Sequence, residues 1–267
     1  MPFTDDDLTY LEAHGLPPLP PADAEGYVEN DGARIWHARY GTGPAVVLLH
    51  GGLGNAGNFG YQVPALLEAG YQVIVVDSRG QGRSTRDEQP YSYQLMASDT
   101  RAVMDALGVA KAAIVGWSDG AATGLVMAKE TPERVTGVFF FGCCVDESGL
   151  WPFKPTPVID RIYNHHVKDY AALSPTPGGF EKMRDDLGPM QQGEPNYSAA
   201  DMATIAVPVW SVVGENDEFI KSEHARYIAD SVPDAHFVLL PIVSHFAPLQ
   251  RPDNFNATVL EFLASLG

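Results

Sequence analysis

Apolar residues occur in short runs that alternate with amphipathic segments along most of the chain. Runs without internal polar alternation are typical of strands buried on both faces of a sheet. Such a run covers residues 45–49, and further strands are predicted over residues 71–76, 112–115, 135–141, 207–213 and 235–240. Helical periodicity predicts helices over residues 93–107, 121–129, 222–230 and 254–266. This alternation predicts an α/β fold, with a mostly parallel sheet flanked by helices on both faces.

Three segments depart from the alternation. Residues 1–25 contain the Pro-rich stretch 16–22, which cannot propagate a helix, and we interpret them as an N-terminal arm on the surface. Residues 26–40 predict an antiparallel hairpin around the turn Asn30-Asp-Gly32. Residues 146–203 are rich in Pro, Gly, Tyr and charges, and are interpreted as an insertion.

The predicted organisation is therefore an arm, a core in two pieces and a cap. The arm covers residues 1–25, the core 26–145 and 204–267, and the cap insertion 146–203 after the fourth parallel strand. Within the cap, helical pieces are predicted over residues 159–170 and 180–186.

The sequence Gly116-Trp117-Ser118-Asp119-Gly120 lies where a buried strand ends and a helix begins. It fits G-x-S-x-G, in which a sharp turn holds the serine in a strained conformation with its hydroxyl exposed. Glycines two residues on either side would remove Cβ atoms that otherwise collide with neighbouring chain. The context predicts that Ser118 is a nucleophile.

A serine nucleophile needs a general base that is itself oriented by a carboxylate. His245 follows the last predicted strand and Asp217 follows the preceding one, so both should reach the sheet edge that carries Ser118. The order Ser118, Asp217, His245 predicts a catalytic triad. We expect His245 to titrate near its unperturbed pKa of about 6.5.

Other carboxylates compete for the role of the acid. Asp146 follows the fourth parallel strand and is the main alternative to Asp217. Glu215 and Glu218 flank Asp217 and are interpreted as solvated loop residues.

These motifs resemble the α/β-hydrolase fold family, in its serine hydrolase or esterase branch with a small helical cap. The resemblance covers nearly all of residues 26–267 and includes His50-Gly-Gly52 and the loop 77–84. It implies an oxyanion hole formed by backbone N–H groups of Gly52 or Leu53 and of Asp119. The Asp119 carboxylate is unusual there and should point away from the developing oxyanion.

The segment Gly52-Leu-Gly54-Asn-Ala-Gly57, with Asp77 twenty residues further on, also matches a dinucleotide-binding fingerprint. That alternative is weakened because His50-Gly51 separates the strand from the first glycine and because a hairpin precedes the strand. The hydrolase interpretation explains the same residues as parts of the oxyanion loop and of the loop 77–84, and it predicts no cofactor.

Composition limits the partners. Against 34 Asp and Glu, the chain has 17 Lys and Arg, a formal net charge of −17, and no basic stripe. Nucleic acids and anionic membranes are bound through clustered Lys and Arg, so neither is expected as a partner. The expected partner is a small-molecule ester or lactone, and the sequence leaves open whether the chain forms a homo-oligomer.

Cysteine and histidine usage point to a cytoplasmic protein without a metal. Cys143 and Cys144 are adjacent, which strains a disulfide, and are interpreted as packing residues. The N-terminus lacks the basic and apolar regions of a secretory signal. His165 and His166 lack ligands at metal-binding spacing and are interpreted as surface residues.

The resulting prediction is a hydrolase that cleaves an ester or lactone of a small neutral or cationic substrate through an acyl-enzyme. The cap carries nine acidic and five basic residues, which disfavours strongly anionic substrates. Predicted substrate-binding residues are Trp117, Trp151, Phe153 and Phe246. C–C bond hydrolysis of ring-cleavage products, amidase or aminopeptidase activity, and a non-catalytic ligand receptor remain alternatives.

Overall fold

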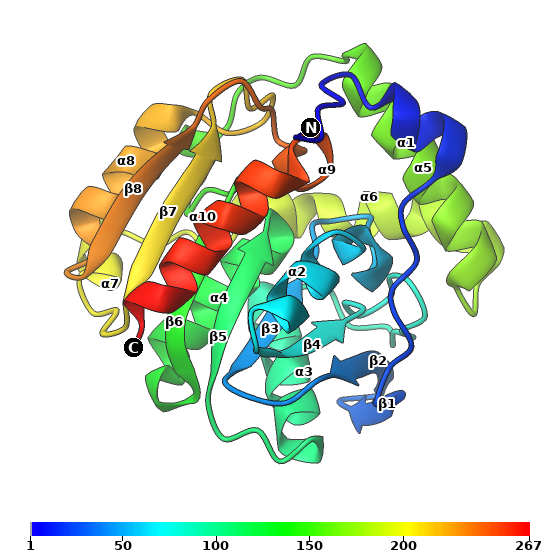
Figure 1. Cartoon of the computed structure of the whole chain (residues 1–267), viewed down its shortest axis with the longest axis horizontal. Helices are drawn as coiled ribbons and strands as arrows, with labels where there is room; N and C mark the ends of the chain where they lie inside the picture. The colour runs from blue at the N-terminus through cyan, green and yellow to red at the C-terminus, as the bar shows by residue number, and fades with distance from the viewer. Residues whose placement is uncertain (1) are drawn as a thin grey trace.

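The predicted strands form an eight-stranded sheet in the computed structural model, which describes residues 2–267 (Figure 1). The strands are β1 (Ala24–Asn30), β2 (Ala33–Tyr40), β3 (Ala45–Leu49), β4 (Gln72–Val76), β5 (Ala112–Trp117), β6 (Val135–Phe141), β7 (Val209–Gly214) and β8 (Ala235–Leu240). Their order is β1-β2-β4-β3-β5-β6-β7-β8. β2 pairs antiparallel with both β1 and β4, and β3 to β8 run parallel to one another. The predicted hairpin and the mostly parallel sheet are thereby confirmed.

Helices cover both faces of this sheet. They are α1 (Thr9–His14), α2 (Gln62–Glu68), α3 (Tyr93–Ala106), α4 (Asp119–Glu130), α5 (Pro157–Leu173), α6 (Phe180–Gly193), α7 (Ala199–Met202), α8 (Ser222–Ser231), α9 (Ala247–Gln250) and α10 (Pro252–Ser265), with short 3-10 helices η1 (Ala56–Phe59), η2 (Pro132–Arg134), η3 (Glu147–Gly149) and η4 (Pro177–Gly179). Figure 1 shows α2 and α10 in front of the sheet, with α3 and α4 behind it.

Alternate residues of β3 pack into two different apolar clusters, one on each face of the sheet. Val47 and Leu49 of β3 belong to the apolar cluster that includes α3 and α4, while Val46 and Leu48 belong to the cluster of α2 and α10. A strand that is apolar on both sides is what this arrangement requires. The same apolar runs that predicted the strands therefore fill both layers.

Two helical segments go beyond what the sequence predicts. Residues 1–25 contain α1, because the Asp5 carboxylate accepts the N–H groups of Thr9 and Tyr10 at 3.1 and 2.8 Å, and Leu8 and Leu11 are buried. α6 extends beyond the predicted end at residue 186 and continues through Pro189 to Gly193. Burial of Leu187 and Met190 favours those last turns although the proline removes one backbone donor.

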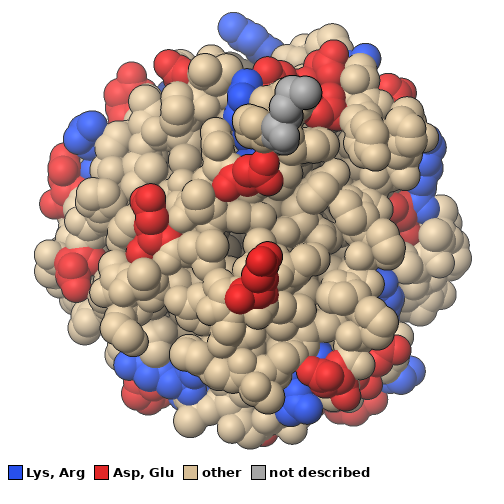
Figure 2. Space-filling model, in the orientation of Figure 1, with Lys and Arg blue, Asp and Glu red and all other residues tan. Residues whose placement is uncertain are grey.

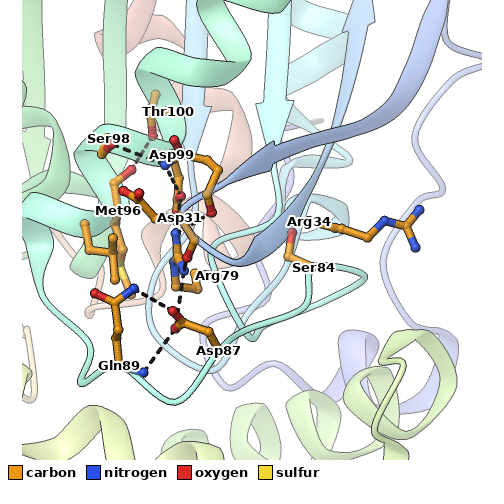
Figure 3. A network of polar contacts seen from close by, with 12 residues as sticks. Asp31, Arg34, Arg79, Ser84, Asp87, Gln89, Met96, Ser98, Asp99 and Thr100 are labelled. Atoms are coloured by element: carbon orange, nitrogen blue, oxygen red, sulfur yellow. Dashed lines mark hydrogen bonds and ion pairs between the residues drawn. The ribbon is translucent and has the colours of Figure 1, made fainter.

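The loop after β4 is held by a buried arginine (Figure 3). The Arg79 guanidinium donates to both oxygens of Asp99 at 2.9 and 2.7 Å and to the carbonyls of Asn30 and Asp31 at 3.0 and 2.9 Å. Arg79 is 1% exposed. Two backbone carbonyls and a carboxylate on α3 thus hold this arginine in place.

Charged side chains lie scattered over the surface. On the face drawn in Figure 2, Lys and Arg are separated from one another by acidic or uncharged side chains. Within residues 2–267, no helix is both long enough and apolar enough to cross a bilayer.

Candidate active site

The nucleophile elbow has the geometry that its sequence predicts. Ser118 lies between β5 and α4 with φ 54° and ψ −121°, outside the regions that L-residues normally occupy. Its N–H donates to Phe141 O on the neighbouring strand at 2.8 Å, which fixes the turn. Ser118 is more exposed than the residues on either side of it. The serine hydroxyl can therefore face a ligand.

Close packing explains the two glycines of the elbow. A Cβ on Gly116 would collide with the backbone of Ala121, and a Cβ on Gly120 would collide with the Leu49 carbonyl. The steric reason inferred from the sequence is confirmed at both positions.

The loops after β7 and β8 bring an acid and a base together. Nδ1 of His245 lies 2.9 and 3.1 Å from the two carboxylate oxygens of Asp217. Asp217 Oδ1 also accepts the N–H groups of Phe219 and Ile220 at 2.9 and 2.8 Å, so its orientation is fixed. Asp146 instead caps η3 by accepting the Ser148 N–H at 2.8 Å. The structure therefore pairs the histidine with Asp217.

A second carboxylate supports the same histidine. Glu218 is half-buried and accepts the backbone N–H of His245 at 3.0 Å. Its interpretation as a solvated loop residue was wrong, because the loop after β8 folds over it. Glu215, by contrast, is exposed.

The charge environment shifts the pKa of His245. Burial alone would lower this pKa, but the charge and hydrogen bond of Asp217, followed by the charge of Glu218, raise it above the usual value. The expectation of an unperturbed value near 6.5 was therefore wrong. The paired carboxylates favour the imidazolium form.

Backbone donors for an oxyanion are available beside Ser118. Among the described residues, none accepts a hydrogen bond from the N–H groups of Gly52, Leu53 or Asp119. Asp119 is the first residue of α4, whose N–H has no acceptor within the helix. A Cβ on Gly51 would lie 3.1 Å from Ser118 Cβ, so the loop and the serine are adjacent.

His50 holds this loop in place rather than facing a substrate. Its Nε2 accepts the Ser78 N–H at 2.9 Å, which leaves the proton on Nδ1 to be donated to Gly51 O at 2.7 Å. Burial lowers the pKa of His50, consistent with a neutral ring. These two hydrogen bonds give His50 a structural role in the loop.

The Asp119 carboxylate is held by two side chains from distant parts of the chain. Tyr93 of α3 donates its hydroxyl to Oδ1, and Gln191 of α6 donates its amide to Oδ2, both at 2.9 Å. Burial raises the pKa of this carboxyl group. Oδ2 nevertheless stays next to the oxyanion loop, since a Cβ on Gly52 would lie only 2.5 Å from it.

These groups line a cavity of about 490 Å³. Ser118 and His245 both face it, as do the four aromatic residues predicted to bind substrate, Trp117, Trp151, Phe153 and Phe246. The wall also includes one face of α5, made of Ile159, Ile162, Tyr163 and His166.

Several lining residues could not be predicted from the sequence. Tyr93 and Gln191 lie on predicted or partly predicted helices, but only the fold brings them to Asp119. His166 is buried, and its interpretation as a surface residue was wrong because its side of α5 faces the cavity. Cys143 and Cys144 are free, buried and part of the cavity wall.

The dinucleotide alternative conflicts with the position of Asp77. This side chain is fully buried, and its oxygens accept the N–H groups of Ala56 and Arg83, each at 2.7 Å. Its carboxylate thus ties the loop after β3 to the loop after β4. A ribose hydroxyl would have no access to it.

No group of three or more potential metal ligands occurs within the part of the chain that the structure describes.

A family model for the alpha/beta hydrolase fold matches residues 44–170. The chain belongs to the α/β-hydrolase fold family. A 2-hydroxy-6-oxo-6-phenylhexa-2,4-dienoate hydrolase from Burkholderia cepacia is 27% identical over 264 residues, which cover 84% of this chain and 89% of that protein.

Solved structures agree with this assignment. An N-acyl homoserine lactone degrading enzyme is 27% identical, with a TM-score of 0.69 over 89% of this chain and 100% of that chain. A bromoperoxidase from Bacillus anthracis shares the fold at 21% identity, with a TM-score of 0.74 over 90% of this chain and 100% of that chain. Together with the dienoate hydrolase, the lactone-degrading enzyme supports hydrolase activity for this α/β-hydrolase.

Proposed function

We propose that this α/β-hydrolase cleaves a carboxylic ester or lactone of a small neutral or cationic substrate through an acyl-enzyme on Ser118. The observation that carries the proposal is the strained Ser118 on the wall that also holds His245, whose Nδ1 pairs with Asp217 at 2.9 Å. A serine, a base and an orienting acid are the groups that acyl transfer requires.

In this mechanism, Ser118 Oγ attacks the carbonyl carbon while His245 Nε2 takes the hydroxyl proton. The negative charge that develops on the carbonyl oxygen is stabilised by the N–H of Asp119 and by that of Gly52 or Leu53. His245 then protonates the leaving alcohol, and a water molecule activated by the same imidazole releases the acyl group. Asp217 keeps the proton on Nδ1 and stabilises the imidazolium.

The charge of the cavity supports neutral or cationic substrates. Asp119 lies in its wall, and Arg184 is the one Lys or Arg among the described residues that line it. The Arg184 guanidinium already donates to Asp185 at 2.8 Å and to the Tyr163 hydroxyl at 2.8 Å. A carboxylate-bearing substrate would therefore meet Asp119 without an unengaged cation to offset it.

C–C bond hydrolysis is the second candidate, because the Burkholderia relative is named for a dienoate substrate. Side-by-side kcat/KM values for a neutral ester, an amino ester and a ring-cleavage dienoate separate the two. We expect the dienoate to be the poorest substrate, and a dienoate turned over much faster than any neutral ester would overturn the charge argument and the leading proposal.

A covalent probe tests the nucleophile directly. A fluorophosphonate should label the parent protein and fail to label Ser118→Ala, which should also lose p-nitrophenyl ester hydrolysis by several orders of magnitude. Ser222→Ala, at the start of α8 and outside the cavity wall, is the matched control and should be labelled like the parent. If Ser118→Ala were labelled as strongly as the parent protein, Ser118 would not be the nucleophile.

A further inference from the structure

Three side chains in the cavity wall carry a buried polar atom without a protein partner. Within residues 2–267 these are Asn58 Nδ2, Trp117 Nε1 and His166 Nδ1. A buried donor or acceptor that lacks a partner costs free energy unless a ligand or water completes it. Two of the three, Asn58 and His166, take no part in the proposed chemistry.

The side-chain amide of Asn58 is oriented by a hydrogen bond from the backbone of η1 to its oxygen. Oδ1 accepts the Asn55 N–H at 2.9 Å as part of a capping box at the start of η1. The opposite end of the amide is therefore the donor Nδ2, and Asn58 is 1% exposed. The orientation of this donor is fixed by the fold rather than by a side-chain partner.

His166 ends the cavity-facing side of α5. The other residues of this face are largely apolar and precede His166 at helical spacing: Ile159, Ile162 and Tyr163. The imidazole is thus the last side chain of this wall. His166 is 6% exposed. Burial, followed by the charge of His165, lowers its pKa to about 3, so the ring is neutral and offers one donor and one acceptor.

A hydrogen bond joins the two elements that carry these side chains. Asn55 Nδ2 donates to Asp169 Oδ2 at 2.9 Å, which ties the start of η1 to α5. Asn58 lies three residues after Asn55, and His166 lies three residues before Asp169, so each is one turn from this link. The wall between η1 and α5 thus contains a fixed donor and a neutral imidazole.

This wall is close to the reaction centre. A Cβ on Gly54 would lie 3.1 Å from Gly51 O and would collide with Asn58 Oδ1, while Gly51 itself adjoins Ser118. The subsite therefore begins on the oxyanion-loop side of Ser118.

We propose that Asn58 and His166 form a subsite for an uncharged oxygen function, a hydroxyl or carbonyl group, in the part of the substrate that does not react. A carbonyl oxygen would accept from both side chains, and a hydroxyl would accept from Asn58 and donate to His166. A carboxylate at this subsite would contact only neutral groups, with no cation to offset its charge. This inference rests on the proposed function and narrows its substrate class to oxygen-substituted esters or lactones.

The test compares p-nitrophenyl hexanoate with derivatives that carry a hydroxyl or oxo group at different positions of the acyl chain. A second series compares hexyl esters with analogues hydroxylated on the alcohol chain. We expect one substituted isomer to be preferred about tenfold in kcat/KM over the unsubstituted ester, since a neutral hydrogen bond of this kind is worth about that factor. His166→Phe should bring this ratio to near unity, whatever its effect on the rate with the unsubstituted ester. His166→Asn, which keeps an amide near the Nδ1 position, should restore part of the preference.

His165→Gln is the matched control, because His165 is the neighbouring histidine of α5 and does not line the cavity. It should leave the ratio unchanged. A purely structural role for His166 would lower Tm and slow both esters equally, and an unchanged ratio in His166→Phe would overturn the proposal. The proposal would also be overturned if the parent protein preferred none of the substituted esters over the unsubstituted one.

Binding to Ser118→Ala separates this proposal from the hydrolase assignment. Calorimetric titration of that variant with the preferred substituted ester and with its unsubstituted analogue should show the same ratio in Kd, whether or not the parent protein turns the esters over. Lack of turnover with a retained binding preference would reject the hydrolase function alone. Equal Kd values, or a crystal structure in which only water contacts Asn58 and His166, would reject the subsite.

Discussion

Two buried polar regions of this molecule are built in opposite ways. Around Arg79, each guanidinium nitrogen has an acceptor, and the carboxylate of Asp99 is shared with the amide of Asn30. In the cavity wall, Asn58 and His166 keep polar atoms for which the described chain offers no partner. A fully satisfied network specifies the fold, whereas unsatisfied groups beside a cavity are available to a ligand. The difference predicts that substitutions in the first region change stability and those in the second change activity.

After loss of the nucleophile, the largest expected effect on activity comes from the triad acid. Asp217→Asn should lower kcat about 10⁴-fold, because the amide no longer stabilises the imidazolium or selects its tautomer. Asp146→Asn is the matched control, since Asp146 caps η3 and is not bonded to His245, and should cost little. Steady-state kinetics on both variants decides the assignment, and the reverse ranking would place the acid after β6.

The largest expected effect on stability lies in the other region. Arg79→Leu should lower the free energy of unfolding by about 3–5 kcal/mol, because it leaves Asp99 buried without its cation. Arg34→Leu is the control: the side chain pairs with Glu29 at 3.5 Å on the surface, points away from the network in Figure 3, and should cost less than about 1 kcal/mol. Urea unfolding measures both.

If Arg79→Leu lowered kcat at temperatures where the protein stays folded, the division between the two regions would fail. A similar loss of stability from Arg34→Leu would show that burial is not what gives Arg79 its effect.

The pH dependence sharpens the description of the site itself. Since the carboxylates around His245 raise its pKa, the neutral base is lost at a higher pH than for a free histidine. On the acidic side, kcat/KM should fall tenfold per pH unit, with a midpoint above about 6.5. Asp217→Asn should move the midpoint downward, and a parent midpoint at or below 6.5 would contradict the described environment.

The smallest effect concerns the strain at the elbow. Ser118→Gly should raise the free energy of unfolding by about 1 kcal/mol, because glycine tolerates a φ of 54° that costs other residues about 1–3 kcal/mol. Ser118→Ala keeps the Cβ and should leave stability close to that of the parent. Thermal unfolding of the two variants compares them, and equal Tm values would mean that the turn stores no strain.

The sequence predicted most of the fold because its signals are local. The runs 135–141 and 235–240 coincide with β6 and β8, and the loops after β5, β7 and β8 place Ser118, Asp217 and His245 by simple chain order. What it could not predict depends on contacts between distant segments. Gln191 reaches Asp119 only because packing carries α6 through Pro189, and α1 forms where Asp5 caps it and Leu11 is buried.

Burial likewise separates two adjacent histidines that look alike in the sequence. His165 lies 3.2 Å from Asp169, whereas His166 faces the cavity. No local pattern distinguishes them, because the direction of each side chain depends on how α5 is rotated against the helices it packs on, α1 and α6.

The hydrogen bond from Gln191 to Asp119 has a thermodynamic consequence. It joins the residue that follows the nucleophile to a helix of the segment between β6 and β7, so displacement of α6 leaves the carboxylate with Tyr93 alone. Linkage is reciprocal: whatever free energy the anion contributes to holding α6, α6 contributes equally to holding the anion. Protonation of Asp119 and displacement of α6 are therefore coupled equilibria, and a change in either one biases the other.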